Sequence, residues 1–334
     1  MNRRMALSWL AMASATAALR PALAGPLTFF RIGTAGTGGT YYPIGSLIAD
    51  AISAPPGSRP CDRGGACGVP GLVASAVATA GSVANVTAIE SGALESGFVQ
   101  GDVAALAWQG VGAWRDRPAG DLRAIANLYP ETLHLIASAA SGIRSVADLQ
   151  GRRVSLDEPG SGTRVDAGLI LQAAGLDMAQ IQAEHLPLSA AAQAMQEGTL
   201  DAFFFVGGHP AATIAELATR MPIIVVPIDQ TLAARIKASY PFLSAAELPA
   251  GIYAGQAEVV QTVSVGALWL TSARMPETLI HDITAALWSE TTLAMLAKGP
   301  RRGRSISREN AVLGLSVPLH PGAERFYREI SILK

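Results

Sequence analysis

The sequence predicts an α/β fold divided into two lobes, with a ligand cleft between them. Short apolar runs typical of strands alternate with alanine-rich segments of helical spacing, as in parallel α/β sheets. This alternation occurs in two similar blocks, and a late strand and further helices follow them. Without its leader the chain has roughly 310 residues, which exceeds the usual size of one hydrophobic core. A chain of this kind is expected to bind its ligand between the lobes.

Residues 1–24 have the layout of a secretory signal peptide. Arg3 and Arg4 precede a mostly apolar run, and "ALA" offers a cleavage site near Ala24. An uncleaved anchor is the alternative, although the run is short for a membrane span. The paired arginines leave both Sec and twin-arginine export open. We expect a periplasmic protein whose mature part has no membrane span.

The charge balance gives no basic footprint for nucleic acid. Charged residues make up 15% of the chain, and its pI is about 6.5. Loss of residues 1–24 removes three arginines and no acids, which takes the formal charge from −1 to −4. The 50% hydrophobic content fits a large core as well as a dimer face. We expect a monomer.

The expected elements assign the chain to lobes. We expect strands over 27–35, 97–100, 221–229 and 261–273, and two β-rich runs over 122–138. Helices are expected over 41–53, 82–94, 103–114 and 276–290, the third of them with Asp102 as its N-cap. Loops are expected over 53–71, 230–258 and 301–307, and segments that combine helix, strand and turn over 146–176 and 193–210. Lobe 1 would comprise 26–130 and 262–334, lobe 2 would comprise 136–230, and 129–136 and 258–268 would form the hinge.

The two cysteines, Cys61 and Cys67, are most simply a local disulfide in an exported protein. As metal ligands they lack a second Cys or His pair nearby, and as a redox pair they lack the C-x-x-C spacing. We therefore expect no metal site here.

Two glycine-rich loops are candidate anion sites. In "GTAGTGGTYYPIG" the third glycine of a dinucleotide fingerprint is replaced by Tyr41, and the lysine of a Walker loop by Gly39. Backbone N–H groups at the start of the next helix can still hold a carboxylate or phosphate. The second loop, "EPGSGT", places Ser161 and Thr163 at another helix start. A ligand-free turn and ordinary helix capping are the alternatives.

No catalytic constellation is recognisable. The five histidines are scattered, and "EPGSGT" does not supply the glycines of a nucleophile elbow. His134 and His209 lie beside apolar strands, where a structural role is the simpler interpretation. Phe203 and Phe205 alternate along a strand and could share one face, in the core or in the cleft.

Taken in order, the motifs "IGTAGTGGTYYPIG", "PPGSRPCDRGGACGVPGL", "GSVANV", "FVQGDVA", "LRAIANLYPETLHLIA", "SLDEPGSGT", "LDAFFFVGGHP" and "LHPGAERFYRE" carry a resemblance to a known family. Over residues 28–334 the chain resembles the TAXI family of solute-binding proteins, the soluble receptors of one class of TRAP transporter. This resemblance implies a type II periplasmic-binding-protein fold of the Venus-flytrap kind. It also implies capture of a small organic anion or amino acid, such as glutamate-like ligands, and delivery to TRAP membrane permease subunits. No enzyme activity, cofactor or metal is implied.

The family pattern also implies a set of ligand-binding residues in this chain: Thr37, Gly38, Gly39, Tyr41, Tyr42, Gln100, Asp102, Tyr129, Glu131, Ser161, Gly162, Thr163, Phe205 and Gly207. The amides of 36–39 and 161–163 would take a carboxylate. Tyr41 or Tyr42 would donate a hydrogen bond or stack on the ligand, and Asp102 or Glu131 would meet an ammonium group if the ligand is an amino acid. Where similar sequences read Q-S-D, this chain has Gln100-Gly101-Asp102, so one hydroxyl contact is missing.

Two other functions remain open at the level of sequence. The same fold could serve as a sensor that presents its ligand to a signalling kinase. A secreted hydrolase is the third reading, against which the missing elbow, triad order and metal motifs argue.

Overall fold

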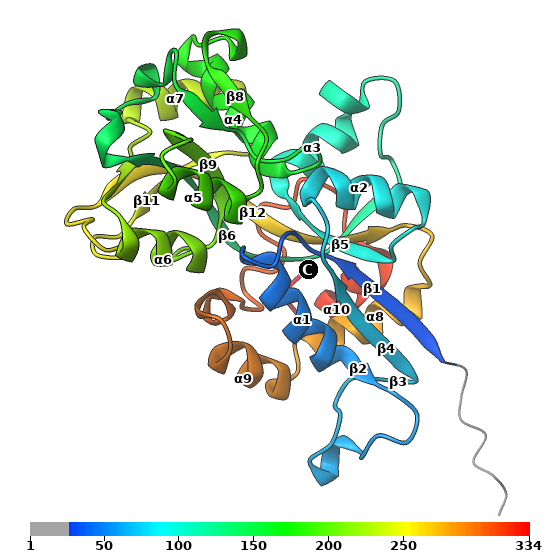
Figure 1. Cartoon of the computed structure of the whole chain (residues 1–334). Helices are drawn as coiled ribbons and strands as arrows, with labels where there is room; N and C mark the ends of the chain where they lie inside the picture. The colour runs from blue at the N-terminus through cyan, green and yellow to red at the C-terminus, as the bar shows by residue number, and fades with distance from the viewer. Residues whose placement is uncertain (1–26) are drawn as a thin grey trace, which may run out of the picture.

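A computed structural model describes residues 27–334. The predicted signal peptide and its cleavage site lie outside these residues. Figure 1 shows two lobes: the segments coloured blue, cyan, orange and red form lobe 1, and the green to yellow segments form lobe 2. The predicted two-lobed α/β fold is confirmed.

Lobe 1 contains one half of a ten-stranded sheet. Its strand order is β4-β1-β5-β12-β6, with β1 at Thr28–Gly33, β4 at Leu72–Val77, β5 at Ser96–Gln100, β6 at Leu122–Ser138 and β12 at Val260–Ser272. Its helices are α1 (Tyr41–Ile52), α2 (Ser82–Ser91), α3 (Gly101–Gln109), α8 (Glu277–Leu287), α9 (Glu290–Lys298) and α10 (Pro321–Glu329). The core gathers around the buried Trp269, whose ring meets Phe30 and Phe98 edge-on with centroids 6.3 Å apart.

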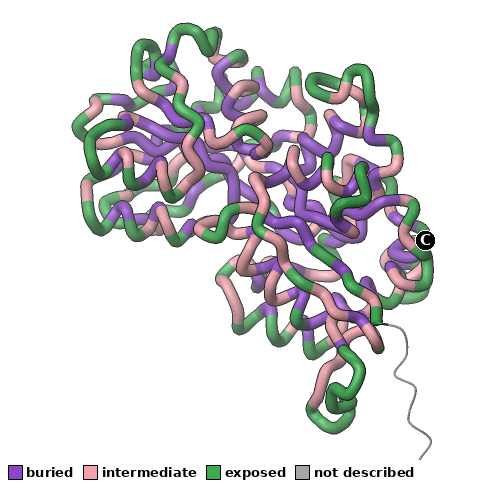
Figure 2. The backbone as a smooth tube through the Cα atoms, turned by 45° about the vertical axis from the view of Figure 1, so that its right-hand side comes forward, coloured by how far each residue is buried: buried purple, intermediate pink, exposed green. Residues whose placement is uncertain are grey.

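Lobe 2 continues the same sheet from β6. The order runs β6-β9-β7-β8, with β7 at Arg153–Ser155, β8 at Gln182–Glu184 and β9 at Ala202–Gly207; β10 (Ile223–Val226) pairs with β6, and β11 (Ser244–Leu248) with β12. Helices α4 (Gly162–Ala174), α5 (Leu188–Gln196), α6 (Ala212–Arg220) and α7 (Gln230–Ser239) complete the lobe. Apolar clusters lie on both faces of its strands, and Phe203 and Phe205 share one of them. Figure 2 shows the buried strands as a continuous purple band through both lobes.

The sheet is mixed, so the prediction of parallel sheets was only partly right. Strand β12 runs antiparallel to β5 and β6, and β6 runs antiparallel to β9. These two long strands are the connections between the lobes. On β6, Tyr129 belongs to the core of lobe 1 and Leu133 to that of lobe 2; on β12 the same change falls between Ala267 and Val265. The segments 129–136 and 258–268, expected to act as hinges, span these crossings.

Four local expectations were wrong. Residues 230–258 are not one loop, because Asp229 caps α7 and Ile236 buries its apolar side, and β11 follows. Residues 122–138 form a single strand rather than two runs. Gln100, and not Asp102, is the N-cap of α3, which places Asp102 in the first turn. The expected basic loop 301–307 contains a 3₁₀ helix, Arg301–Ser305, in which Gly303 is buried.

The predicted disulfide between Cys61 and Cys67 is confirmed. It closes part of the segment between β2 (Ser53–Ala54) and β3 (Val69–Pro70), which includes a 3₁₀ turn at Cys61–Arg63. None of the residues 55–68 is buried. The segment extends away from the body of lobe 1 as a largely exposed loop (Figures 1 and 2).

Candidate ligand-binding site

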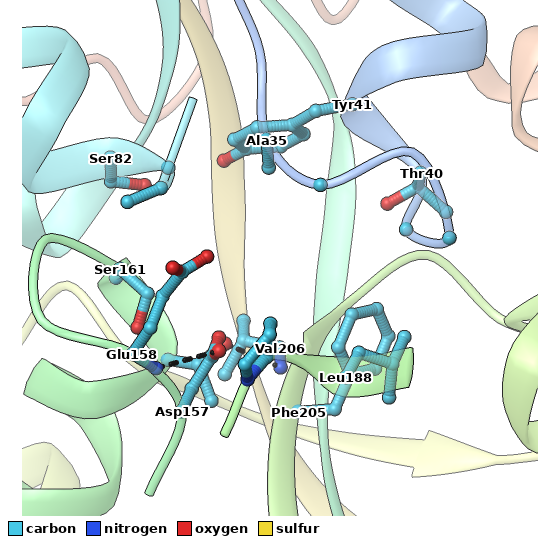
Figure 3. A pocket seen from close by; sticks show the side chains of 18 of the residues that line it. Ala35, Thr40, Tyr41, Ser82, Asp157, Glu158, Ser161, Leu188, Phe205 and Val206 are labelled. Carbon is cyan, nitrogen blue, oxygen red and sulfur yellow. Dashed lines mark hydrogen bonds between the residues drawn. The ribbon is translucent and has the colours of Figure 1, made fainter. Parts of the chain in front are cut away.

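A cavity of about 390 Å³ lies between the lobes (Figure 3). Lobe 1 lines it with residues 35–41, 80–82 and Gln100, and lobe 2 lines it with 157–158, 161–163, 187–189, Phe205 and Val206. Glu131 contributes from β6, at the crossing between lobes. Figure 3 shows Ala35, Thr40, Tyr41 and Ser82 facing Asp157, Glu158, Ser161 and Phe205 across the cavity.

Five helices begin at this cavity. Their N-cap residues are Thr40 for α1, Gly81 for α2, Gln100 for α3, Ser161 for α4 and Pro187 for α5, and all five line it. A helix N-terminus carries unpaired N–H groups and the positive end of the helix dipole. The cavity therefore offers hydrogen-bond donors and positive potential without requiring a cationic side chain.

The start of α4 is built by its capping residues. The Ser161 hydroxyl oxygen accepts the N–H of Arg164 at 3.1 Å, and that of Thr163 accepts the N–H of Val206 at 3.1 Å. Each hydroxyl oxygen thus accepts a backbone N–H, and its hydrogen can still be donated to another partner. The capping interpretation of Ser161 is correct, and it is compatible with a ligand contact.

The glycine loop before α1 touches lobe 2 directly. The Thr213 hydroxyl donates to the carbonyl of Gly38 at 3.2 Å, and the N–H of Gly208 donates to the Thr40 hydroxyl at 3.1 Å. On the other side of the cavity the N–H of Ala84 donates to the carbonyl of Gly160 at 3.0 Å. These bonds join the lobes on two sides of the cavity, so the structure represents a closed arrangement.

Three carboxyl groups line the cavity. Glu131 is buried and accepts the Tyr41 hydroxyl at 2.6 Å, and burial raises its pKa to about 8. Burial likewise raises the pKa of Asp157 to about 6, although the N–H of Glu158 donates to its carboxylate at 2.8 Å. Asp157 also holds a left-handed backbone with φ of 72°, a strained conformation for a residue other than glycine. Within the described chain, neither lysine nor arginine lines the cavity.

Most of the predicted ligand-binding residues come together here. Ten line the cavity: Thr37, Gly38, Gly39, Tyr41, Gln100, Glu131, Ser161, Gly162, Thr163 and Phe205. Four do not: Tyr42 follows Tyr41 on α1, Gly207 ends β9, and Asp102 and Tyr129 are buried away from the cavity wall. The two glycine loops expected to face each other across a cleft do so.

The sequence reasoning missed several lining residues. They are Ala35 and residues 80–82, 157–158 and 187–189. Thr40 and Val206 also line the cavity and lie within the ligand loops 37–42 and 205–208 that the family resemblance implies. Gly81 lies between strand β4 and helix α2, and Ser82 is the first residue of α2, which is the same strand–glycine–helix pattern that singled out the other two loops. That signal could have identified them. Nothing in the sequence distinguishes Leu188 from a core leucine.

The two histidines beside the strands have structural partners. His134 is fully buried, and its ring bonds the carbonyl of Thr132 and the hydroxyl of Tyr253 at 3.0 Å each. Its pKa is lowered to about 3 by burial, so it stays neutral. His209 meets the guanidinium of Arg302 at 2.7 Å, which joins lobe 2 to the 3₁₀ helix of lobe 1.

The sequence was compared with known protein families. The sequence matches the NMT1-like family over residues 32–330. The chain belongs to the NMT1-like family. This family is of the periplasmic-binding-protein type, which agrees with the two lobes and the cavity between them. The more specific resemblance of this NMT1-like chain to TAXI receptors stays a prediction.

Solved structures similar to this NMT1-like chain are distant in sequence. The periplasmic aliphatic sulphonate binding protein SsuA from Escherichia coli is 18% identical over 92% of this chain and 79% of its own, with a TM-score of 0.40. SsuA from Xanthomonas axonopodis pv. citri, bound to MOPS, is 17% identical over 93% and 96%, with a TM-score of 0.45. A putative L-cystine ABC transporter from Listeria monocytogenes is 14% identical over 85% and 100%, with a TM-score of 0.49.

Between residues 27 and 334 no helix has the length and apolar character needed to cross a membrane. In the same part of the chain, no three His, Cys, Asp or Glu side chains are grouped as metal ligands.

Proposed function

We propose that this NMT1-like chain is the extracytoplasmic solute receptor of a TRAP-type secondary transporter. It would capture a small carboxylate-bearing molecule between its lobes and deliver it to the membrane permease without chemical turnover. The observation that carries this proposal is the meeting of five helix N-termini, three from lobe 1 and two from lobe 2, around one cavity between the lobes.

The charges around the cavity favour an amino acid over a simple organic anion. The helix starts at Ser82 and Ser161 would hold the carboxylate through N–H groups and hydroxyls. The carboxyl groups of Asp157 and Glu158 would meet an ammonium group on the same ligand. An anion without such a group would have to approach these carboxylates with no cationic side chain to offset them.

Isothermal titration calorimetry with two matched probes tests the ligand class. L-Glutamate and glutarate carry the same two carboxylates, and only L-glutamate carries an ammonium group. We expect L-glutamate to bind at least tenfold more tightly, about 1.4 kcal/mol. Equal affinity, or tighter binding of glutarate, would show that Asp157 and Glu158 do not recognise an ammonium group.

Paired substitutions test the start of α4. Ser161→Ala with Thr163→Val removes both hydroxyls and should weaken L-glutamate binding at least tenfold, since each charge-assisted hydrogen bond contributes roughly 1.5–3 kcal/mol. Thr87→Val with Ser91→Ala makes the same changes on an exposed part of α2 and is the control. Unchanged affinity in both double variants would exclude these hydroxyls from the site.

The transporter class is tested by reconstitution. Receptor and candidate permease in proteoliposomes should take up the bound solute with an imposed ion gradient and no ATP. Uptake that needs ATP would replace the TRAP assignment with an ABC one, and binding without any transport would favour the sensor function.

A further inference from the structure

Two aspartates meet where the lobes touch, beside the cavity. Asp102 lies in the first turn of α3 in lobe 1, and Asp166 lies on α4 in lobe 2. Each has only 1% of its surface exposed. Gln100, the N-cap of α3, bonds Asp166 across the lobes, and the Asp102 and Asp166 carboxyl groups are close enough for each to shift the pKa of the other. Two carboxyl groups can form a hydrogen bond only when they share a proton.

The surroundings leave these carboxyl groups without a compensating cation. Gln100 on β5 donates its side-chain amide to one oxygen of Asp166. The other oxygen of Asp166 and both oxygens of Asp102 are buried and find no other side-chain donor among the described residues.

The groups that face the pair from neighbouring elements are neutral or acidic. Strand β6 contributes Glu131, whose charge acts on both aspartates. From α2 comes the hydroxyl of Ser82, which bonds Gln100, and the loop before α4 carries Asp157 and Glu158 at the cavity wall. Among these groups, Glu131 and the two aspartates oppose one another's ionisation.

Two adjacent buried carboxyl groups cannot both be ionised without a large cost in free energy. With one shared proton they form a charge-assisted hydrogen bond that joins the lobes. When the lobes separate, both side chains gain water and return toward the ordinary pKa of aspartate, near 4, so the proton is released at neutral pH.

We propose that Asp102 and Asp166 form a proton-binding site that is complete only when the lobes are closed, so that closure takes up one proton. The site lies outside the cavity lining, and its occupant is a proton rather than the solute. The inference rests on the proposed function only in assuming that the lobes open and close.

Small-angle X-ray scattering of the ligand-free mature chain tests the coupling. Profiles measured between pH 5.5 and 8.5 at constant ionic strength are fitted as mixtures of open and closed forms. We expect the closed-to-open ratio to fall by up to about tenfold per pH unit as the pH rises, the limit for one proton. A ratio that does not change with pH would overturn the proposal.

Variants identify the groups responsible. Asp166→Asn supplies an amide that donates to Asp102 and accepts from Gln100, so the closed-to-open ratio should depend less on pH than in the wild type, by up to about tenfold per pH unit. Asp50→Asn, on an exposed position of α1, should keep the wild-type profile. If Asp166→Asn is misfolded by circular dichroism, Asp102→Asn makes the same test. A wild-type pH profile in the folded variant would refute the shared proton.

Two further arms separate the alternatives. Titration with NaCl or CaCl₂ at pH 8 should leave the closed-to-open ratio unchanged, and cation-driven closure would mean that the pair binds a metal instead of a proton. The scattering experiment contains no solute, so its outcome does not depend on which ligand the chain binds. If L-glutamate fails to bind, the proposed amino-acid ligand is wrong and the shared proton is unaffected. If L-glutamate binds but closure does not depend on pH, the shared proton is wrong and the proposed ligand is unaffected.

Discussion

Glu131 is a buried acidic residue that lies both at the connection between the lobes and in the cavity wall. It lies on β6 at the crossing between lobes, lines the cavity, and is buried against the Tyr41 hydroxyl. Burial and the nearby Asp102 raise its pKa to about 8, whereas the Tyr41 hydrogen bond opposes the shift. At neutral pH the folded chain therefore favours the protonated form of this carboxyl group.

This raised pKa predicts that stability falls as the pH rises. Between pH 4.5, the ordinary value, and about 8, the folded chain holds a proton that the unfolded chain has released. The free energy of unfolding should therefore decrease by up to about 1.4 kcal/mol per pH unit in this window. Glu131→Gln should flatten that slope, as measured by urea unfolding from pH 5 to 8.

The control for this substitution is Glu258→Gln, at an exposed glutamate. It should retain the wild-type slope. Some slope should also remain in Glu131→Gln, because Asp157, Asp102 and Asp166 have raised pKa values too. Parallel curves for wild type and Glu131→Gln would show that Glu131 titrates alike in both states.

At the residue scale, the sequence predicted the parts of the site that depend on residues close together in the chain. Glycines and hydroxyl residues between a strand and a helix marked the loops around Gly38 and Gly162, and both line the cavity. Contacts between residues that are far apart in the sequence could not be predicted. The contact of Asp102 with Asp166, and the burial of Glu131, depend on how two lobes meet, which no local pattern encodes.

At the scale of elements, boundaries followed from capping and from apolar spacing when both were noticed. The segment 230–258 shows the opposite case: Leu232 and Ile236 have helical spacing behind a capping Asp229, yet the polar residues around them resembled a loop. The antiparallel direction of β12 could not be predicted from strand–helix alternation, because it depends on a long-range pairing.

The disulfide loop receives little support from the rest of the fold. Because none of residues 55–68 is buried, the Cys61–Cys67 bond restrains a segment that few other contacts hold. Reduction should therefore accelerate trypsin cleavage after Arg63 severalfold and hardly change the urea midpoint. Cleavage after Arg220, at the end of α6, provides the internal reference. Equal acceleration at both sites would indicate global destabilisation instead.

At the scale of the whole molecule, closure depends on how near the lobes can approach. A side chain at Gly162 on α4 would place its Cβ 1.7 Å from the Gln100 amide oxygen and 2.8 Å from the Ser82 hydroxyl, both on lobe 1. Since Gln100 is itself buried and bonded to Asp166, it has little room to withdraw. Glycine at this position permits the closed arrangement.

Gly162→Ala should therefore shift the chain toward the open form. At pH 5.5, small-angle scattering should give a larger radius of gyration than for the wild type, with unchanged circular dichroism. Gly168→Ala, on the same helix with no neighbouring atom within 4 Å of its added Cβ, should match the wild type. If both variants are as compact as the wild type, contact at Gly162 does not limit closure.

The position of β12 also determines the order in which the chain can acquire its structure during synthesis. This strand lies between β5 and β6 in the sheet, although it is made after every helix and strand from β7 to β11. Until residues 260–272 have left the ribosome, β5 and β6 expose unpaired edges that other chains could pair with. The core of lobe 2 draws almost wholly on residues 133–243. Lobe 2, from the middle of the sequence, can therefore fold before lobe 1, although lobe 1 contains the N-terminal residues. Until β12 is made, the N-terminal third of the chain is the part that needs protection from aggregation.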